Sequence, residues 1–391
     1  MLKILVSWLR WRARRARKST FLPAGVRTLV AVELTRLGDF VTILPALRAL
    51  RSRFPAARTF VVTSEAHAPL LELCEPGIDV ICVRKPKTLI GFLSVLRMVR
   101  RMSPDLVCSM GPANRNAALS LASGAPFIVG YLNGTDSLTP FLGVTPVESI
   151  GFSGGTNVAF AGENIHDRPW KVLQSIGVSI PRDPLVNFPR WKPDDRRVAR
   201  HRLLGLRGRY VVMHPFSGWE FRSWPLSRFR SLAERMLGQL PSGVVFLCSD
   251  LEADQLKPLR DAFKRTERVV FVPSSDILDS AVLIQRADLF IGNDSGPLHL
   301  AALLGVPVVG LFGPALPGHT APYAARGVFI YRKVSCSPCA QTHCIIPTNS
   351  CMNRITVEEV YDAANGLLGE ARDYPVASWM NSGCWTCAST R

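Results

Sequence analysis

The chain has 391 residues, of which 47% are hydrophobic and 20% are charged, and its formal net charge at pH 7 is +17. This composition excludes an intrinsically disordered protein, and the length suffices for two domains of ordinary size, each with its own core. The excess of positive charge predicts an anionic partner, which could be nucleic acid, an anionic lipid surface or an anionic small molecule.

Much of the positive charge lies in the basic, amphipathic segment 1–25, which combines Lys and Arg with Leu and Trp. Its apolar part is shorter than the roughly 20 residues that cross a bilayer, and its charges follow the apolar stretch, the reverse of a secretory signal. We therefore expect a cytoplasmic protein held peripherally on the inner face of the cell membrane, with a disordered basic arm as the alternative. No zinc-finger, RNP or helix-turn-helix pattern follows, so nucleic acid is not an expected partner.

From residue 26 to residue 185, apolar runs typical of strands alternate with segments of helical spacing. The expected strands are RTLVAVEL, RTFVVTS, IDVICV, PDLVCSM and APFIVGY. A Pro-rich linker at 186–207 follows, and the alternation restarts over 208–370 with RYVVMHP, GVVFLCS, RVVFVPS, DLFIGND and VPVVGLFG. This pattern predicts an α/β protein with two Rossmann-like, doubly wound domains facing across a cleft, then a tail at 371–391. Ligands of such sheets bind beyond the carboxyl ends of the strands.

The turn after the strand DLFIG reads NDSGPLH and starts a helix. Pro297 suits the first turn of a helix, and Gly296 lets a ligand approach the backbone closely. The amides at this helix start and the Ser295 hydroxyl are typical of an anion site, for which a diphosphate is the expected ligand. Asp294 would repel an anion, so we expect it to cap the helix or to orient His299. An ordinary capped helix without a ligand is the alternative.

A cysteine-rich loop at 336–351 has the spacing C-x2-C-x4-C-x6-C. In a reducing compartment, four such thiols predict a structural zinc or iron site with Cys336, Cys339, Cys344 and Cys351 as ligands. Cys384 and Cys387 form a further C-x2-C pair. Free thiols are the alternative, and a metal here is expected to fasten a loop without taking part in catalysis.

Several of these segments resemble glycosyltransferase family 9, whose best-known members are the lipopolysaccharide heptosyltransferases. The resemblance is carried by VELTRLGDFVTILPALRALRSRFP, VVMHPFSGWEFRSWPLSRFRSLAERM, GNDSGPLHLAALLGVPVVGLFGP and the cysteine-bearing segment. It implies the GT-B architecture and transfer of a sugar from a nucleotide-diphospho-sugar, with inversion and with no cofactor required for catalysis.

The resemblance also implies roles for single residues. Asp39 would be the base that takes the proton of the acceptor hydroxyl, with helix capping as the alternative. Arg222 stands where the family usually has Lys and would neutralise the diphosphate leaving group. The other residues expected to bind the nucleotide-sugar are Ser217, Asp294, Ser295, Gly296 and His299, together with Asp250 or Glu252 at the ribose.

Arg36 and Arg115 lie at strand ends or helix starts of the first domain and are expected to hold an anionic acceptor. The expected reaction moves a sugar from ADP-heptose to a lipid-linked saccharide such as a lipopolysaccharide core, although no residue distinguishes heptose from other sugars. A nucleotide-sugar epimerase on the same fold and a non-catalytic nucleotide-sugar-binding adaptor are the alternatives.

Overall fold

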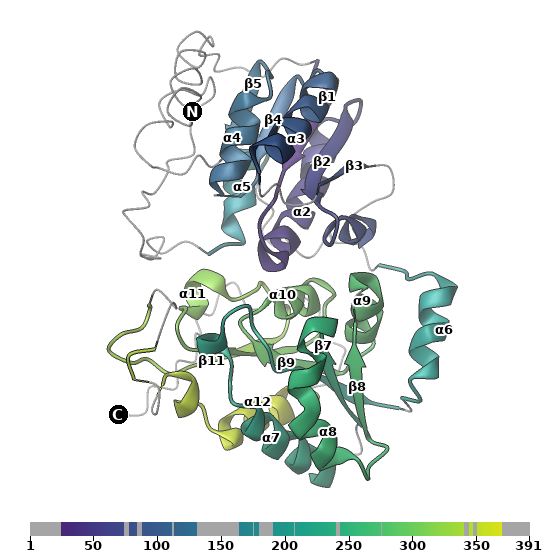
Figure 1. Cartoon of the computed structure of the whole chain (residues 1–391), viewed down its shortest axis with the longest axis vertical. Helices are drawn as coiled ribbons and strands as arrows, with labels where there is room; N and C mark the ends of the chain where they lie inside the picture. Colours follow the sequence, from purple (N-terminus) through teal and green to yellow (C-terminus); the bar gives the residue numbers. More distant parts are fainter. Residues whose placement is uncertain are drawn as a thin grey trace. The chain divides into compact units, whose positions relative to one another are not determined.

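The computed structural model describes residues 25–73, 78–83, 88–111, 113–130, 164–174, 176–179, 191–206, 208–239, 243–274, 276–339, 344–346 and 350–369. The chain divides into two compact units, Met1–Pro184 and Leu185–Arg391 (Figure 1). The predicted linker contains a helix, α6 (Asp195–Leu203), that belongs to the second unit and packs against its helix α9 (Ile277–Gln285). Arg197 of α6 pairs with Asp276 and Asp279 at the start of α9, with 2.7 Å between nitrogen and oxygen in both pairs.

The first unit contains a five-stranded parallel sheet of order β3-β2-β1-β4-β5. Its strands are β1 (Thr28–Val32), β2 (Arg58–Ser64), β3 (Asp79–Val83), β4 (Leu106–Ser109) and β5 (Phe127–Gly130). The connecting helices are α2 (Leu37–Arg53), the 3-10 helix η1 (Ala68–Leu73), α3 (Leu89–Arg101) and α4 (Asn114–Ala122), and α5 (Asp167–Gln174) follows. Each of the five expected strands is present.

The second unit contains a six-stranded parallel sheet of order β11-β10-β9-β6-β7-β8. Its strands are β6 (Tyr210–His214), β7 (Gly243–Cys248), β8 (Val269–Pro273), β9 (Leu289–Asn293), β10 (Val308–Phe312) and β11 (Gly327–Tyr331). The remaining helices are α7 (Leu226–Gln239), α8 (Lys257–Phe263), α10 (Gly296–Leu303), α11 (Pro317–Thr320) and α12 (Val357–Gly369), with 3-10 helices η3 (Glu220–Arg222), η4 (Asp250–Leu256) and η6 (Met352–Arg354).

This arrangement confirms the predicted α/β class with two Rossmann-like, doubly wound sheets. One strand was not predicted. β11 is an edge strand with one buried residue in five, although Val328–Tyr331 form a short apolar run.

The strand order reverses between β1 and β4 in the first sheet and between β6 and β9 in the second. In open parallel sheets, ligands bind beyond the carboxyl ends of the strands at such a reversal. The segments that matter most for function are therefore those that follow β1, β4, β6 and β9.

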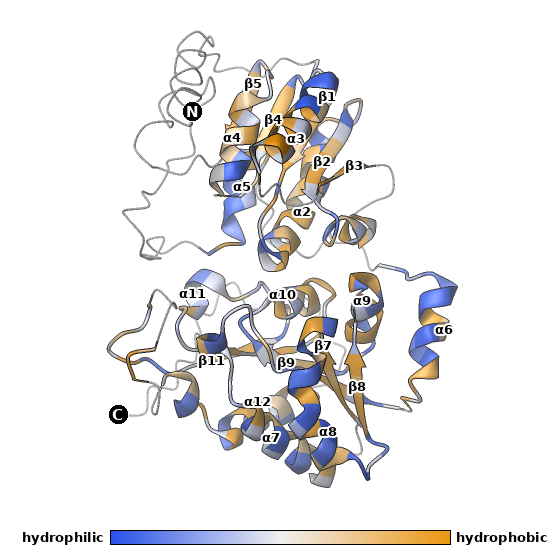
Figure 2. Cartoon of the chain, viewed as in Figure 1, coloured by the Kyte–Doolittle hydropathy of each residue, from blue (hydrophilic) through white to orange (hydrophobic). Residues whose placement is uncertain are grey.

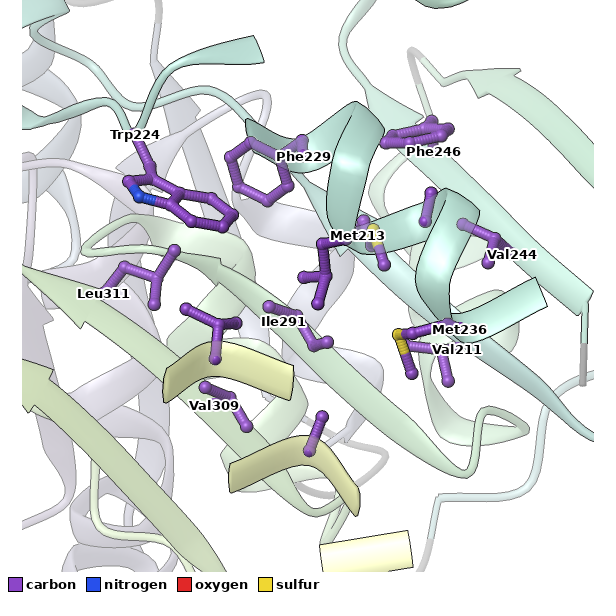
Figure 3. Packing of buried hydrophobic residues seen from close by; sticks show 14 of the residues in the cluster. Val211, Met213, Trp224, Phe229, Met236, Val244, Phe246, Ile291, Val309 and Leu311 are labelled. Atoms are coloured by element: carbon purple, nitrogen blue, oxygen red, sulfur yellow. The ribbon is translucent and has the colours of Figure 1, made fainter. Parts of the chain in front are cut away.

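Each unit has its own apolar core. The strands of both sheets are largely hydrophobic, whereas α6 is mostly hydrophilic (Figure 2). In the second unit, Trp224 and Phe229 meet edge to face with ring centroids 5.0 Å apart, and both pack above the sheet (Figure 3). Val211, Ile291 and Leu311 from three neighbouring strands belong to the same cluster, so the sheet is anchored directly beneath the segment that precedes α7.

Candidate functional site

The segments that follow β6 and β9 are joined by one buried side chain, Asn293. Its Oδ1 accepts a hydrogen bond from the backbone N–H of Trp224 at 2.9 Å, and its Nδ2 donates to the carbonyl of Pro215 at 2.7 Å. The indole N–H of Trp224 donates in turn to the carbonyl of Ile355 at 2.9 Å. The loop 215–224 is thus held at both ends, because an unpaired amide would be costly in this buried position.

This loop brings Arg222 to Asp294. The Nη2 of Arg222 donates to Oδ2 of Asp294, and the hydroxyl of Thr320 donates to the same oxygen at 3.2 Å. The two side chains are only 15% and 6% exposed, so water screens the pair weakly. The structure therefore brings together the cation expected at the diphosphate and the acid of the NDSG turn.

The predicted capping role of Asp294 is wrong. The N-cap of α10 is Ser295, and Asp294 makes its side-chain contacts with Arg222 and Thr320 instead. Its carboxylate is drawn away from the helix start by a guanidinium, which binds it more strongly than one backbone amide would.

The start of α10 carries no side-chain cap, and Ser295 and Gly296 are partly exposed. The Ser295 hydroxyl lies 3.5 Å from Nδ1 of His214, the last residue of β6. Burial lowers the pKa of His214, so the imidazole is neutral at pH 7, although the charge of Glu252 opposes this shift. His299 is a buried residue of α10, and it is only 3% exposed.

The side chain of Ser217 forms hydrogen bonds within its own loop. Its hydroxyl donates to the carbonyl of Trp219 and lies 3.1 Å from the hydroxyl of Ser223. Of the two residues expected at the ribose, Glu252 forms a capping box with Ser249, whose N–H and hydroxyl donate to Oε2 at 2.9 and 2.8 Å. Asp250 is exposed, so its carboxylate is the one open to solvent.

At the carboxyl edge of the first sheet, Asp39 is the third residue of α2, which begins at Leu37 with Arg36 as its N-cap. The alternative that Asp39 only caps this helix is therefore wrong. Its side chain is partly exposed, and its charge lies within the first helical turn, where the helix dipole stabilises an anion.

Arg36 and Arg115 have exposed side chains. Arg36 follows β1, and Arg115 lies in the first turn of α4, which follows β4. Because β1 and β4 are neighbours at the reversal of strand order, both cations stand at the edge where an anionic acceptor was expected.

Sequence reasoning missed Glu33, which follows β1 and is completely buried. Its Oε1 accepts hydrogen bonds from the backbone N–H and hydroxyl of Thr35 and from Nδ2 of Asn116. Burial, and then the nearby charge of Asp39, raise the pKa of Glu33 to about 7. No sequence signal distinguishes this acid from one in an exposed turn.

The structure does not support the predicted metal site. Within the part of the chain that the structure describes, no three His, Cys, Asp or Glu side chains are placed to hold a metal ion. The candidate ligands Cys336, Cys339, Cys344 and Cys351 are free thiols. Burial, and then the charges of the other three cysteines, raise the pKa of Cys351 to about 11. Cys384 and Cys387 lie outside the described residues.

Membrane contact was expected from residues 1–25, of which 1–24 lie outside the described residues. Among the helices that the structure describes, none combines the length and the apolar character needed to cross a membrane.

Comparison with known proteins places these features in a family context. Residues 187–349 match the model of glycosyltransferase family 9 (heptosyltransferase). Over 306 residues the chain is 24% identical to the lipopolysaccharide core heptosyltransferase OpsX of Haemophilus influenzae, an alignment that spans 76% of this chain and 82% of the relative.

Two solved structures are similar along most of the chain. A family 9 glycosyltransferase of Veillonella parvula covers 90% of this chain and 100% of its own, with a TM-score of 0.74 and 23% identity. The ADP-heptose lipopolysaccharide heptosyltransferase II of E. coli covers 88% of this chain and 98% of its own, with a TM-score of 0.67 and 18% identity. These two likenesses concern the fold.

Proposed function

We propose that the chain is a glycosyltransferase of family 9 and that it transfers heptose from ADP-heptose, with inversion, to the saccharide of a lipopolysaccharide core. The observation that carries the proposal is the Arg222–Asp294 pair beside the uncapped start of α10, within the segment that matches the family. The heptose and the lipopolysaccharide core are proposed because the relatives described above are named for them.

In this proposal the second domain binds the donor. A diphosphate would be held by the first amides of α10, the Ser295 hydroxyl and the planar guanidinium of Arg222. Arg222 already contacts Asp294, so a diphosphate must compete with that carboxylate for the guanidinium. Asp294 then becomes available to accept a hydrogen bond from a hydroxyl of the donor sugar. At the ribose we propose Asp250, since Glu252 is engaged with Ser249.

The first domain would supply the base. The acceptor oxygen forms a bond to the anomeric carbon while the bond from that carbon to the diphosphate oxygen breaks. The hydroxyl proton passes to Asp39, and the negative charge that develops on the leaving group is neutralised by Arg222. One displacement of this kind inverts the anomeric centre and uses no metal. Arg36 and Arg115 would hold anionic groups of the acceptor, and residues 1–25 would keep the enzyme at the inner face of the membrane, near a lipid-linked acceptor.

The test is transfer itself. The full-length protein is incubated with ADP-heptose and a core saccharide that lacks heptose. Mass spectrometry should show one added heptosyl residue, and NMR should show the inverted anomeric configuration. Isomerisation of the sugar without acceptor would indicate an epimerase, and donor binding without turnover of either kind would indicate an adaptor. Either result contradicts the proposal.

Substitution of Arg222 tests the donor site. Arg222→Ala should lower the donor-induced rise in melting temperature and reduce transfer by about 10- to 100-fold, because a charge-assisted contact to the diphosphate is lost. Arg222→Lys restores the cation usual in the family and should recover part of the activity. Arg230→Ala is the matched control, because Arg230 pairs with Glu234 on the exposed face of α7. Equal loss in Arg222→Ala and Arg230→Ala would contradict the assignment.

A further inference from the structure

A buried carboxyl group lies directly behind the connection that carries the proposed base. Glu33 lies in the run of buried residues that begins in β1 and ends at Leu34, and its backbone N–H donates to the carbonyl of Val62 on β2 at 3.0 Å. Six residues later the chain has entered α2 and reached Asp39. The segment between them is short, so whatever fixes Glu33 also restrains the start of α2.

The two oxygens of Glu33 have unequal surroundings. Oε1 receives the backbone N–H of Thr35 at 3.0 Å, the Thr35 hydroxyl, and Nδ2 of Asn116 at 3.2 Å. Oε2 is buried and has no hydrogen-bond partner among the residues that the structure describes, and it faces Gly111 so closely that a Cβ built there would lie 2.2 Å from it. One oxygen therefore favours the ionised form, whereas the other loses its hydration without compensation.

Asn116 extends the restraint to the backbone. It lies completely buried on α4, and its Oδ1 accepts the N–H of Leu34 at 3.1 Å while its Nδ2 binds Glu33. Glu33 and Asn116 together hold residues 33–35, which lead into the N-cap of α2 at Arg36. The position of Asp39 thus depends on contacts made by a side chain that does not itself reach the surface.

The groups that act on the Glu33 charge are few. Burial and the negative charge of Asp39 disfavour its ionisation, and the hydrogen bonds from Thr35 and Asn116 favour it, so its pKa rises to about 7. The neighbouring strands place uncharged groups beside Glu33. These are the backbone carbonyl of Val62 on β2 and Gly111 in the segment that follows β4. The cations on the neighbouring segments, Arg36 and Arg115, have exposed side chains and are not among the causes of the shift.

We propose that Glu33, fixed by Thr35 and Asn116 behind the start of α2, is a positioning residue for Asp39 and that its carboxylate, when ionised, makes Asp39 a stronger base for the transfer. The inference rests on the proposed function. In the reaction the O–H bond of the acceptor breaks and an O–H bond forms on Asp39, so Asp39 changes from charged to neutral. A neighbouring negative charge disfavours the charged form and favours the neutral one, and ionised Glu33 therefore lowers the barrier. Glu33 takes no proton from the substrate.

The test is the dependence of kcat on pH, measured with the full chain at saturating donor and acceptor. In the native protein, kcat should rise at least about threefold as pH increases through 7, because the interaction of two nearby carboxylates is partly screened. Glu33→Gln keeps the shape of the side chain and removes the ionisation, so this rise should vanish with little change in the donor KM. A rise that persists unchanged in Glu33→Gln overturns the proposal.

A second variant covers the case in which Glu33→Gln does not fold. Thr35→Val removes the hydroxyl that donates to Oε1, so the rise in kcat should move to higher pH. Thr42→Val is the matched control, because the Thr42 hydroxyl donates to the backbone carbonyl of Asp39 at 2.7 Å and does not contact Glu33. A rise at the same pH in native protein, Thr35→Val and Thr42→Val would overturn the proposal.

Asp39→Asn distinguishes failure of the proposed base from failure of the role proposed for Glu33. If Asp39→Asn retains native activity, the proposed base is wrong, and the proposal for Glu33 falls with it. If Asp39→Asn is inactive while the native protein and Glu33→Gln share one pH profile, the proposed function stands and the role of Glu33 alone is refuted.

Discussion

The carboxyl edges of the two sheets share one topological scheme and organise charge in opposite ways. Beyond β6 and β9, a cation and an anion lie in contact, Arg222 with Asp294. Beyond β1, two acids lie near each other, and the charge of Asp39 helps to keep a proton on Glu33. The first arrangement suits exchange of one anion for another, and the second suits proton uptake. In the proposed function, one fold would therefore support two different tasks, because the segments that follow the strands, and not the sheets, carry the charged side chains.

The sharpest way to break this comparison is Asp39→Asn. The amide cannot take a proton, so transfer should fall by about 10²- to 10⁴-fold while donor-induced thermal stabilisation persists. Steady-state kinetics and melting curves measure the two effects. Asp79→Asn serves as the control, since Asp79 is an exposed acid of the same domain that pairs with Arg58. Activity within about tenfold of the native protein would remove Asp39 from the mechanism.

The dependence of stability on pH tests Glu33, the buried acid that follows β1. Glu33 keeps its proton up to a pKa of about 7 when folded, whereas its ordinary value is 4.5. Between these pH values the folded state binds more protons than the unfolded state, so the free energy of unfolding should fall by about 3 kcal/mol as pH rises. Glu33→Gln should lack this loss. Urea unfolding at a series of pH values measures it, and parallel curves for the two proteins would contradict the expectation.

Packing around Gly111, which follows β4, can be compared with packing around Gly218 in the loop after β6. In Gly111→Ala the new methyl group would meet Oε2 of Glu33, so we expect a loss of about 1–3 kcal/mol in the free energy of unfolding. Gly218→Ala is the matched change in the loop after β6, where nothing lies within 4 Å of the added Cβ, and it should alter stability by less than about 0.5 kcal/mol. Equal effects would show that the two edges do not differ in packing.

The smallest expected effects distinguish the roles of Asp250 and Glu252, the two acids that follow β7. Glu252→Ala breaks the capping box with Ser249 and should cost about 1 kcal/mol of stability with the donor affinity unchanged. Asp250→Ala removes an exposed carboxylate and should weaken donor binding without a change in melting temperature. Isothermal titration with ADP-heptose, together with melting curves, checks both. The reverse outcome would assign the ribose to Glu252.

The sequence was informative where physical signals are local. Continuous apolar runs marked ten of the strands, including the half-exposed edge strands β3 and β8. β11 was missed although Val328–Tyr331 are also apolar. The site was less accessible to such reasoning. Arg222 and Asp294 are separated by 72 residues and Glu33 and Asn116 by 83, so their contacts arise only after the strands have paired. The capping role expected for Asp294 failed for the same reason, because a distant guanidinium outcompeted the adjacent amides.

The paired hydrogen bonds of Asn293 bear on what ligand binding costs. They fix both ends of the loop that carries Ser217 and Arg222 before any ligand arrives. The conformational entropy of ordering that backbone is therefore lost during folding and not during association, so a ligand has to reorient little more than one guanidinium. A buried amide side chain can in this way determine how tightly a ligand of this loop is held.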